Sequence, residues 1–84
     1  MKNCIITFRS VMPAQRAEEM LRRMGVHCTV QRTPKLLEEK GCGYSLRLSC
    51  QDLMAATMLL RQAGISYRKA YSLSENDTPE ELRL

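Results

Sequence analysis

Two segments of the chain carry apolar residues spaced three and four apart, which predicts helices with one buried face. Gly25 and Gly64 follow these segments, and Ser49 with Asp52 forms a capping box before the second one. The methionines at helical spacing are expected to fill the core. The first apolar set is Ala14, Ala17, Met20, Leu21 and Met24, the second is Leu53, Ala56, Leu59, Leu60 and Ala63, and the further methionines are Met54 and Met58.

Four β-prone runs surround these helices, at about residues 3–8, 26–31, 43–48 and 65–71. The two halves repeat at an offset of 39 residues, the distance from Ser10 to Ser49 and from Gly25 to Gly64. The order β-α-β-β-α-β predicts an α+β, ferredoxin-like fold over residues 1–73, with a four-stranded antiparallel sheet and two helices on one face. In this arrangement the first and third strands lie side by side at the centre.

The segment 74–84 belongs to neither repeat. It contains Pro79 and four acidic residues. We expect an acidic tail that is mobile, or helical only near Pro79 to Leu82.

Chain direction through this fold gathers several segments at one end of the sheet. The exit of the first strand at Arg9 and Ser10, the connection from Thr33 to Gly43 and the turn at Gly64 all meet there. We therefore expect Cys42 to lie close to Arg9.

Composition restricts the function classes. The chain has 84 residues, 44% of them hydrophobic, and a net charge of +4. It contains no apolar run of the roughly 20 residues that a membrane span needs, and no signal-peptide pattern at its start. We expect a cytoplasmic protein with four free thiols. Residues 1–72 hold twelve basic against five acidic residues, which favours an anionic ligand or an acidic partner.

Among the four cysteines, Cys42 has the strongest pattern for reactivity. Gly41 and Gly43 leave it unshielded, while Lys35, Lys40 and Arg9 would favour its thiolate. The alternative is a small residue at a turn where only the glycines matter. We expect Cys4 and Cys28 to be inert core thiols, and Cys50 to lie half-buried at the first turn of the second helix, where an incidental role and a lowered thiol pKa both remain open.

Several runs of the sequence resemble one family. They are Cys4 to Phe8, Leu21 to Gly25, Thr33-Pro34-Lys35 and Cys42-Gly43, and the likeness to the putative selenium/sulfur (Se/S) carrier protein-like domains covers about residues 2–71. The resemblance implies that Cys42 accepts sulfur or selenium as a persulfide or selenosulfide, that Gly43 leaves the backbone open, and that Thr33 and Pro34 fix the start of the loop. Lys35 stands where the family usually has arginine. The resemblance further implies a carrier that is not a turnover enzyme, needs no cofactor, and receives its atom from a sulfur-transfer protein such as a cysteine desulfurase.

Other function classes remain open. A non-catalytic binding or regulatory module of the same fold would form a homodimer or bind a small ligand. Nucleic-acid binding is disfavoured, because the sheet face expected to expose Thr7, Thr29 and Arg47 carries no stacking aromatic residue in the predicted register. The spacing of cysteines and His27 predicts no metal site.

Overall fold

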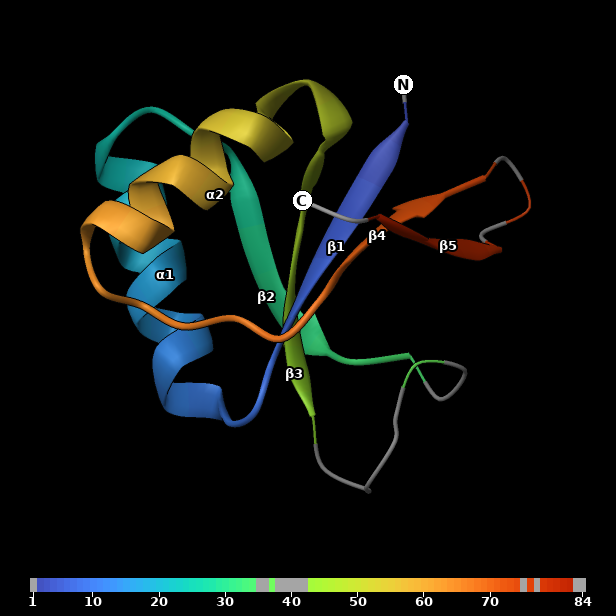
Figure 1. Cartoon of the computed structure of the whole chain (residues 1–84), viewed down its shortest axis with the longest axis horizontal. Coiled ribbons are helices and arrows are strands. Elements are labelled where there is room, and N and C mark those ends of the chain that lie inside the picture. Colours follow the sequence, from blue (N-terminus) through green and yellow to red (C-terminus); the bar gives the residue numbers. More distant parts are fainter. Residues whose placement is uncertain (1, 35–36, 38–42, 75, 77, 83–84) are drawn as a thin grey trace.

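The computed structural model describes residues 2–34, 37, 43–74, 76 and 78–82. Within these residues the chain forms an α+β fold of two α-helices and a five-stranded antiparallel sheet, with strand order β2-β3-β1-β4-β5 (Figure 1). The elements are β1 (Asn3–Phe8), α1 (Val11–Arg23), β2 (Cys28–Arg32), β3 (Tyr44–Ser49), the 3₁₀ turn η2 (Cys50–Asp52), α2 (Leu53–Gln62), β4 (Ala70–Leu73) and β5 (Pro79–Leu82).

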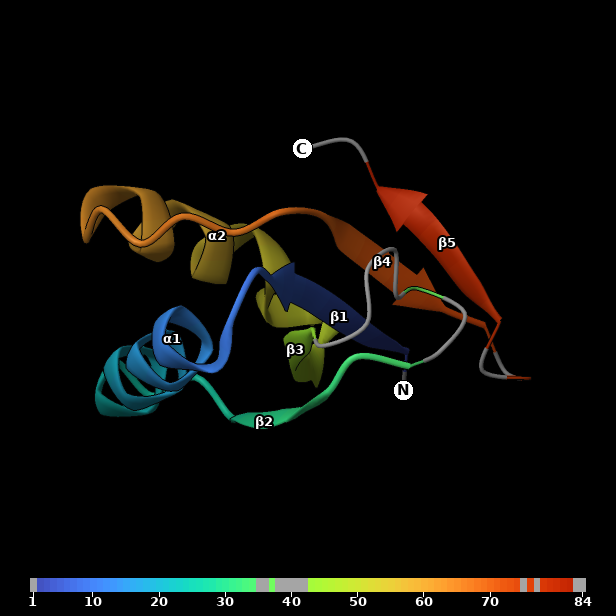
Figure 2. The same cartoon turned by 90° about the horizontal axis from the view of Figure 1, so that it is seen from below.

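Both α-helices lie on the same side of the sheet, as Figure 2 shows. The inward face of the two central strands presents Cys4, Ile6, Phe8, Leu46 and Leu48 to them, all buried. The helices pack small and branched residues against this face at the expected spacing: Ala14, Ala17 and Leu21 from α1, and Leu53, Ala56 and Leu60 from α2. The predicted apolar stripes therefore form the core, and the alanines let the helices approach the sheet closely.

The expectation that the methionines fill this core is wrong for three of the four. Met24, Met54 and Met58 are 60%, 65% and 56% exposed, and Met20 alone of the four packs partly against the core. Met54 and Met58 share a helix with the buried stripe of α2 but lie outside it, and Met24 follows the last residue of α1.

The fourth strand begins later than predicted, at Ala70 instead of Ile65. A β-bulge explains the difference, because Arg68 and Lys69 together oppose the single residue Thr7. The Thr7 N–H donates to the Lys69 carbonyl at 2.8 Å and the Arg68 N–H donates to the Thr7 carbonyl at 2.7 Å. The Lys69 N–H is taken by Thr7 Oγ1 at 3.1 Å, which ends the regular ladder.

The sheet has five strands instead of the predicted four, and the expected mobile or helical tail is incorrect, because residues 79–82 form the edge strand β5. It pairs antiparallel with β4 from Leu73↔Pro79 to Ala70↔Leu82. Pro79 is tolerated as the first residue of an edge strand, where its missing N–H is not needed. Leu82 packs against the core, so this strand extends the buried layer as well as the sheet.

A disulfide between Cys4 and Cys50 corrects the expectation of four free thiols. The register of β1 on β3 pairs Cys4 with Leu48, which brings Cys50 to the inward face beside Cys4 with Cα atoms 5.0 Å apart. This separation lies within the usual range for a disulfide. Cys4 is fully buried and Cys50 half-buried, so the expected burial of both sulfurs is confirmed although their free state is not.

Candidate functional site

The candidate site predicted from the sequence is described only in part. Cys42, Gly41, Lys35 and Lys40 lie outside the described residues. Arg9, Thr33, Pro34 and Gly43 are described, and they border the connection between β2 and β3 or the end of β1.

Thr33 and Gly43 hold the two ends of this connection together. The Thr33 N–H donates to the Gly43 carbonyl at 3.0 Å, and the Leu37 N–H donates to the Pro34 carbonyl at 2.8 Å. A Cβ atom on Gly43 would meet Thr33 Oγ1 at 3.0 Å and Thr33 Cβ at 3.4 Å. Close approach to Thr33 therefore calls for a glycine here, immediately after Cys42.

Thr33 carries a buried hydroxyl with no hydrogen-bond partner in the structure. The residue is 6% exposed, and Oγ1 is one of two such side-chain atoms among the described residues, with Ser45 Oγ. Leaving a buried hydroxyl unpaired costs about 1–3 kcal/mol. A polar group of this kind, next to the residue that follows Cys42, is a hydrogen-bonding group available at the base of the loop.

Arg9 lies near the same point, because Phe8 pairs with Tyr44 at the end of the β1–β3 ladder. The Phe8 carbonyl is 4.0 Å from the position a Gly43 Cβ would take, and Arg9 is the next residue along the chain. Arg9 is exposed, and it lines a pocket together with residues 66–69. The strand pairing thus gathers Arg9, Thr33, Gly43 and the approach to β4 at one end of the sheet.

Cys28 is the one free cysteine among the described residues, and it is buried between α1 and the sheet. It is 5% exposed, and its thiol donates to the Glu18 carbonyl at 3.9 Å. Burial, with a smaller contribution from the Glu18 charge, raises the pKa of the Cys28 thiol above its ordinary value. A neutral, enclosed thiol is a poor nucleophile, which agrees with the expectation of an inert core residue.

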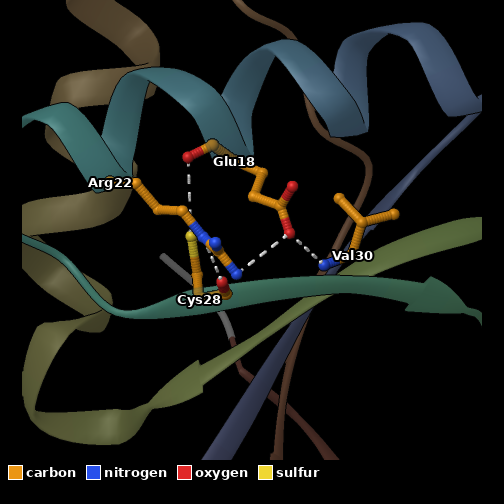
Figure 3. Close-up of polar contacts among 4 residues, drawn as sticks. All are labelled: Glu18, Arg22, Cys28 and Val30. Carbon is orange, nitrogen blue, oxygen red and sulfur yellow. Dashed lines mark hydrogen bonds and ion pairs between the residues drawn. The ribbon is translucent and has the colours of Figure 1, made fainter.

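Figure 3 shows why Glu18 and Arg22 approach Cys28. Both side chains reach from α1 to β2, an edge strand of the sheet. The Val30 N–H donates to Glu18 Oε2 at 2.8 Å, and Arg22 Nε donates to the Cys28 carbonyl at 3.0 Å. Arg22 also forms an ion pair with Glu18 at 3.6 Å. These side chains satisfy backbone groups that an edge strand would otherwise present to solvent.

Replacing Glu18 by alanine is therefore expected to destabilise the protein by about 1–2 kcal/mol, because the Val30 N–H loses a charged acceptor. Urea unfolding followed by circular dichroism measures this difference. Glu19→Ala is the matched control: Glu19 is also paired four residues on, with Arg23, but both side chains are exposed, so the expected cost is about 0–0.5 kcal/mol. Equal costs for the two variants would contradict the role of Glu18 at the edge strand.

The sheet face away from the helices gives no support to nucleic-acid binding. Thr29 and Arg47 are exposed there as expected, but Thr7 is 7% exposed and therefore buried. Tyr71, opposite Ile5 in the register, places an aromatic ring on this face that the sequence reading missed, yet it is 8% exposed. A tyrosine buried to this extent cannot stack on a base.

The described residues contain no group of three His, Cys, Asp or Glu side chains that could hold a metal ion. In the same part of the chain, no helix is both long enough and apolar enough to cross a bilayer.

The fold and these residues define a two-layer α+β protein in which Thr33 and Gly43 are paired at the two ends of the β2–β3 connection, whose sequence contains a glycine-flanked cysteine. The chain belongs to the putative Se/S carrier protein-like family, whose model matches residues 3–72. This confirms the resemblance seen in the sequence. No curated protein and no solved structure matches the chain.

Proposed function

We propose that this protein is a sulfur or selenium carrier that holds the transferred atom on Cys42. The observation that carries the proposal is membership of the Se/S carrier protein-like family over residues 3–72, together with the glycine-flanked cysteine of the loop. The strand order β2-β3-β1-β4 supports a ferredoxin-like arrangement for the first four strands and the two helices, with β5 added at the edge. We place the carrier in the cytoplasm.

The transfer is a thiol–persulfide exchange. The Cys42 thiolate attacks the terminal sulfur of a donor persulfide, forming a new S–S bond while the donor's S–S bond breaks. The donor leaves as a thiolate, and Cys42 carries the persulfide. An acceptor nucleophile then takes the terminal sulfur, and Cys42 returns to its thiolate. Selenium follows the same exchange as a selenosulfide.

The described residues would assist this exchange from the base of the loop. Arg9 supplies a positive charge at this end of the sheet, which favours a thiolate or persulfide anion over its neutral form. The unpaired Thr33 hydroxyl, buried beside Gly43, is a hydrogen-bond donor for the same anion. Thr33 and Pro34 fix the start of the loop. From the sequence alone, Gly41 and Gly43 leave space for the donor protein, and Lys35 and Lys40 add positive charge.

A cysteine desulfurase is the donor class that fits this chemistry, since it presents a protein-bound persulfide. The experiment incubates the protein with a cysteine desulfurase and cysteine and then measures intact mass. We expect the added mass of one sulfur atom on the wild-type protein, lost on addition of reductant, and no addition on Cys42→Ser.

Two control variants locate the adduct. Cys28→Ala removes the buried free thiol, and Cys4→Ala/Cys50→Ala removes the disulfide; both are expected to accept sulfur as the wild type does. An adduct that persists in Cys42→Ser, or no adduct on the wild type with an active desulfurase, would reject the carrier proposal in favour of a binding module.

A further inference from the structure

A pocket of about 530 Å³ lies where β1 leaves the sheet for α1. Its walls come from three segments: the turn after β1, the first turn of α1, and the stretch that leads into β4. Pockets of this volume are in the range that binds metabolite-sized ligands. The lining residues are Arg9, Ser10, Pro13, Ser66, Tyr67, Arg68 and Lys69.

The β-bulge shapes one wall of this pocket. Because Arg68 and Lys69 both oppose Thr7, the chain before them leaves the ladder and bends away from β1. Thr7 Oγ1 holds the bend from both sides, accepting from the Lys69 N–H at 3.1 Å and donating to the Lys69 carbonyl at 3.2 Å. Four hydrogen bonds from Thr7 to Arg68 and Lys69 therefore fix the position of the bulge.

The lining is strongly cationic. Two arginines and a lysine contribute to it, and the described residues that line it include no acid. The two arginines belong to different segments, Arg9 to the turn after β1 and Arg68 to the bulge. Two guanidinium groups on separate segments can bind one oxyanion from two directions, each with paired N–H donors.

The start of α1 adds partial positive charge at the same place. Ser10 is the N-cap residue, but its side chain makes no capping hydrogen bond, and the first turn contains no acidic residue. Pro13, at the third helical position, has no N–H, which removes one of the two backbone donors that an N-cap serine oxygen can accept from. The amides at the helix start thus favour an anion in the neighbouring pocket.

We propose that this pocket, called here the Arg9 pocket, binds a small molecule through an oxyanion group of the phosphate class. Arg9 and Arg68 bind the oxygens, while Pro13 and the half-buried Tyr67 offer apolar surface to the rest of the molecule. The pocket shares Arg9 with the proposed carrier site, but anion binding there requires neither Cys42 nor carrier chemistry.

Glu81 opposes this binding. It lies on β5 and pairs with Lys69 at 3.4 Å, so it brings negative charge to the margin of the pocket. Glu81→Gln is therefore expected to strengthen anion binding by about twofold to fivefold, the effect of one exposed charge. This variant tests the sign of the electrostatic argument, because a binding gain cannot result from damage to the fold.

The test is a titration of the full-length ¹⁵N-labelled protein, followed by NMR at constant ionic strength. The probes are inorganic phosphate and adenosine monophosphate, with sodium chloride as the salt control. We expect saturable shifts at residues 9–13 and 66–69, with Kd below about 5 mM for at least one probe. Tighter binding of the nucleotide indicates an organic phosphate as the ligand, and equal binding indicates that the phosphate group alone is recognised.

Matched arginine variants identify the site. Arg9→Gln and Arg68→Gln are each expected to weaken binding about tenfold, through loss of a charge-assisted contact. Arg47→Gln removes the same charge from the middle of β3, outside the pocket, and is expected to change Kd less than about twofold. Cys42→Ser is expected to leave binding unchanged, which separates this proposal from the carrier function. Shifts that do not saturate, or that Arg47→Gln reduces as much as Arg9→Gln does, would overturn the proposal.

Discussion

Reduction of the Cys4–Cys50 disulfide is expected to lower the free energy of unfolding by about 2–4 kcal/mol. The bridge joins residues 46 positions apart, so it removes considerable freedom from the unfolded chain. It ties β1 to the turn that starts α2, and thereby holds the central strand to the helix layer. For a domain of this size the loss corresponds to a decrease in Tm of about 10 °C or more.

Thermal unfolding with and without a phosphine reductant measures this change, with intact mass as the check on complete reduction. The double variant Cys4→Ala/Cys50→Ala is the control, and its Tm is expected not to respond to the reductant. A wild-type Tm that stays constant on full reduction would show that the bridge contributes nothing to stability. A response in the double variant would point to another bond.

Gly43→Ala is expected to destabilise the protein by about 1–3 kcal/mol, the usual cost of overpacking. The new Cβ would meet Thr33 Oγ1 at 3.0 Å, and Thr33 is too buried to move aside freely. Since Gly43 directly follows Cys42, the same change would also disturb the base of the loop. We therefore expect slower sulfur acceptance in this variant as well as lower stability.

A double-mutant cycle isolates the contact. Thr33→Ala removes the obstructing hydroxyl, so Gly43→Ala is expected to cost about 1 kcal/mol less in that background. Gly64→Ala serves as the control glycine: it has a φ of 72° and open space around it, so its cost is backbone strain that adds independently to Thr33→Ala. Additive costs for Gly43 and Thr33 would contradict the packing argument.

The spacing of apolar residues predicted the core of this fold, because it is regular along the central strand and along the buried faces of both helices. β1 has the predicted bounds, and Ala14, Ala17 and Leu21 face the sheet at the predicted spacing. The methionines failed the same rule, since a long flexible side chain at the margin of a stripe satisfies helical spacing without being buried. The spacing of apolar residues identifies the buried face of a helix, but whether a residue at the margin of that face is buried depends on the tertiary structure.

The other errors arose from pairing between distant residues. The bulge at Arg68 and Lys69 depends on the Thr7 side chain 62 positions away, which no local pattern contains. The strand β5 forms because β4 offers an open edge, and its acidic residues had indicated a solvated tail. The disulfide follows from the register of β1 on β3, whereas the expectation of free thiols rested on compartment alone.

The candidate site was only partly accessible to sequence reasoning. Its glycines and cations could be named from the loop sequence, and strand direction put Arg9 at the end where Gly43 lies. The unpaired hydroxyl of Thr33 could not be found this way, because whether a buried group has a hydrogen-bond partner depends on its neighbours in space. The involvement of Arg68 and Tyr67 likewise required the bulge that places them beside Arg9.

The contacts that Glu18 and Arg22 make to β2 also bear on assembly. An approaching strand needs free backbone groups, and at this edge the Val30 N–H and the Cys28 carbonyl are already occupied. At the opposite edge, β5 carries Glu80 and Glu81, whose charges would repel a second copy aligned along it. Strand addition is thus opposed at one edge by occupied donors and acceptors and at the other by like charge. Both edges of the described sheet therefore disfavour strand addition by a second copy of this chain.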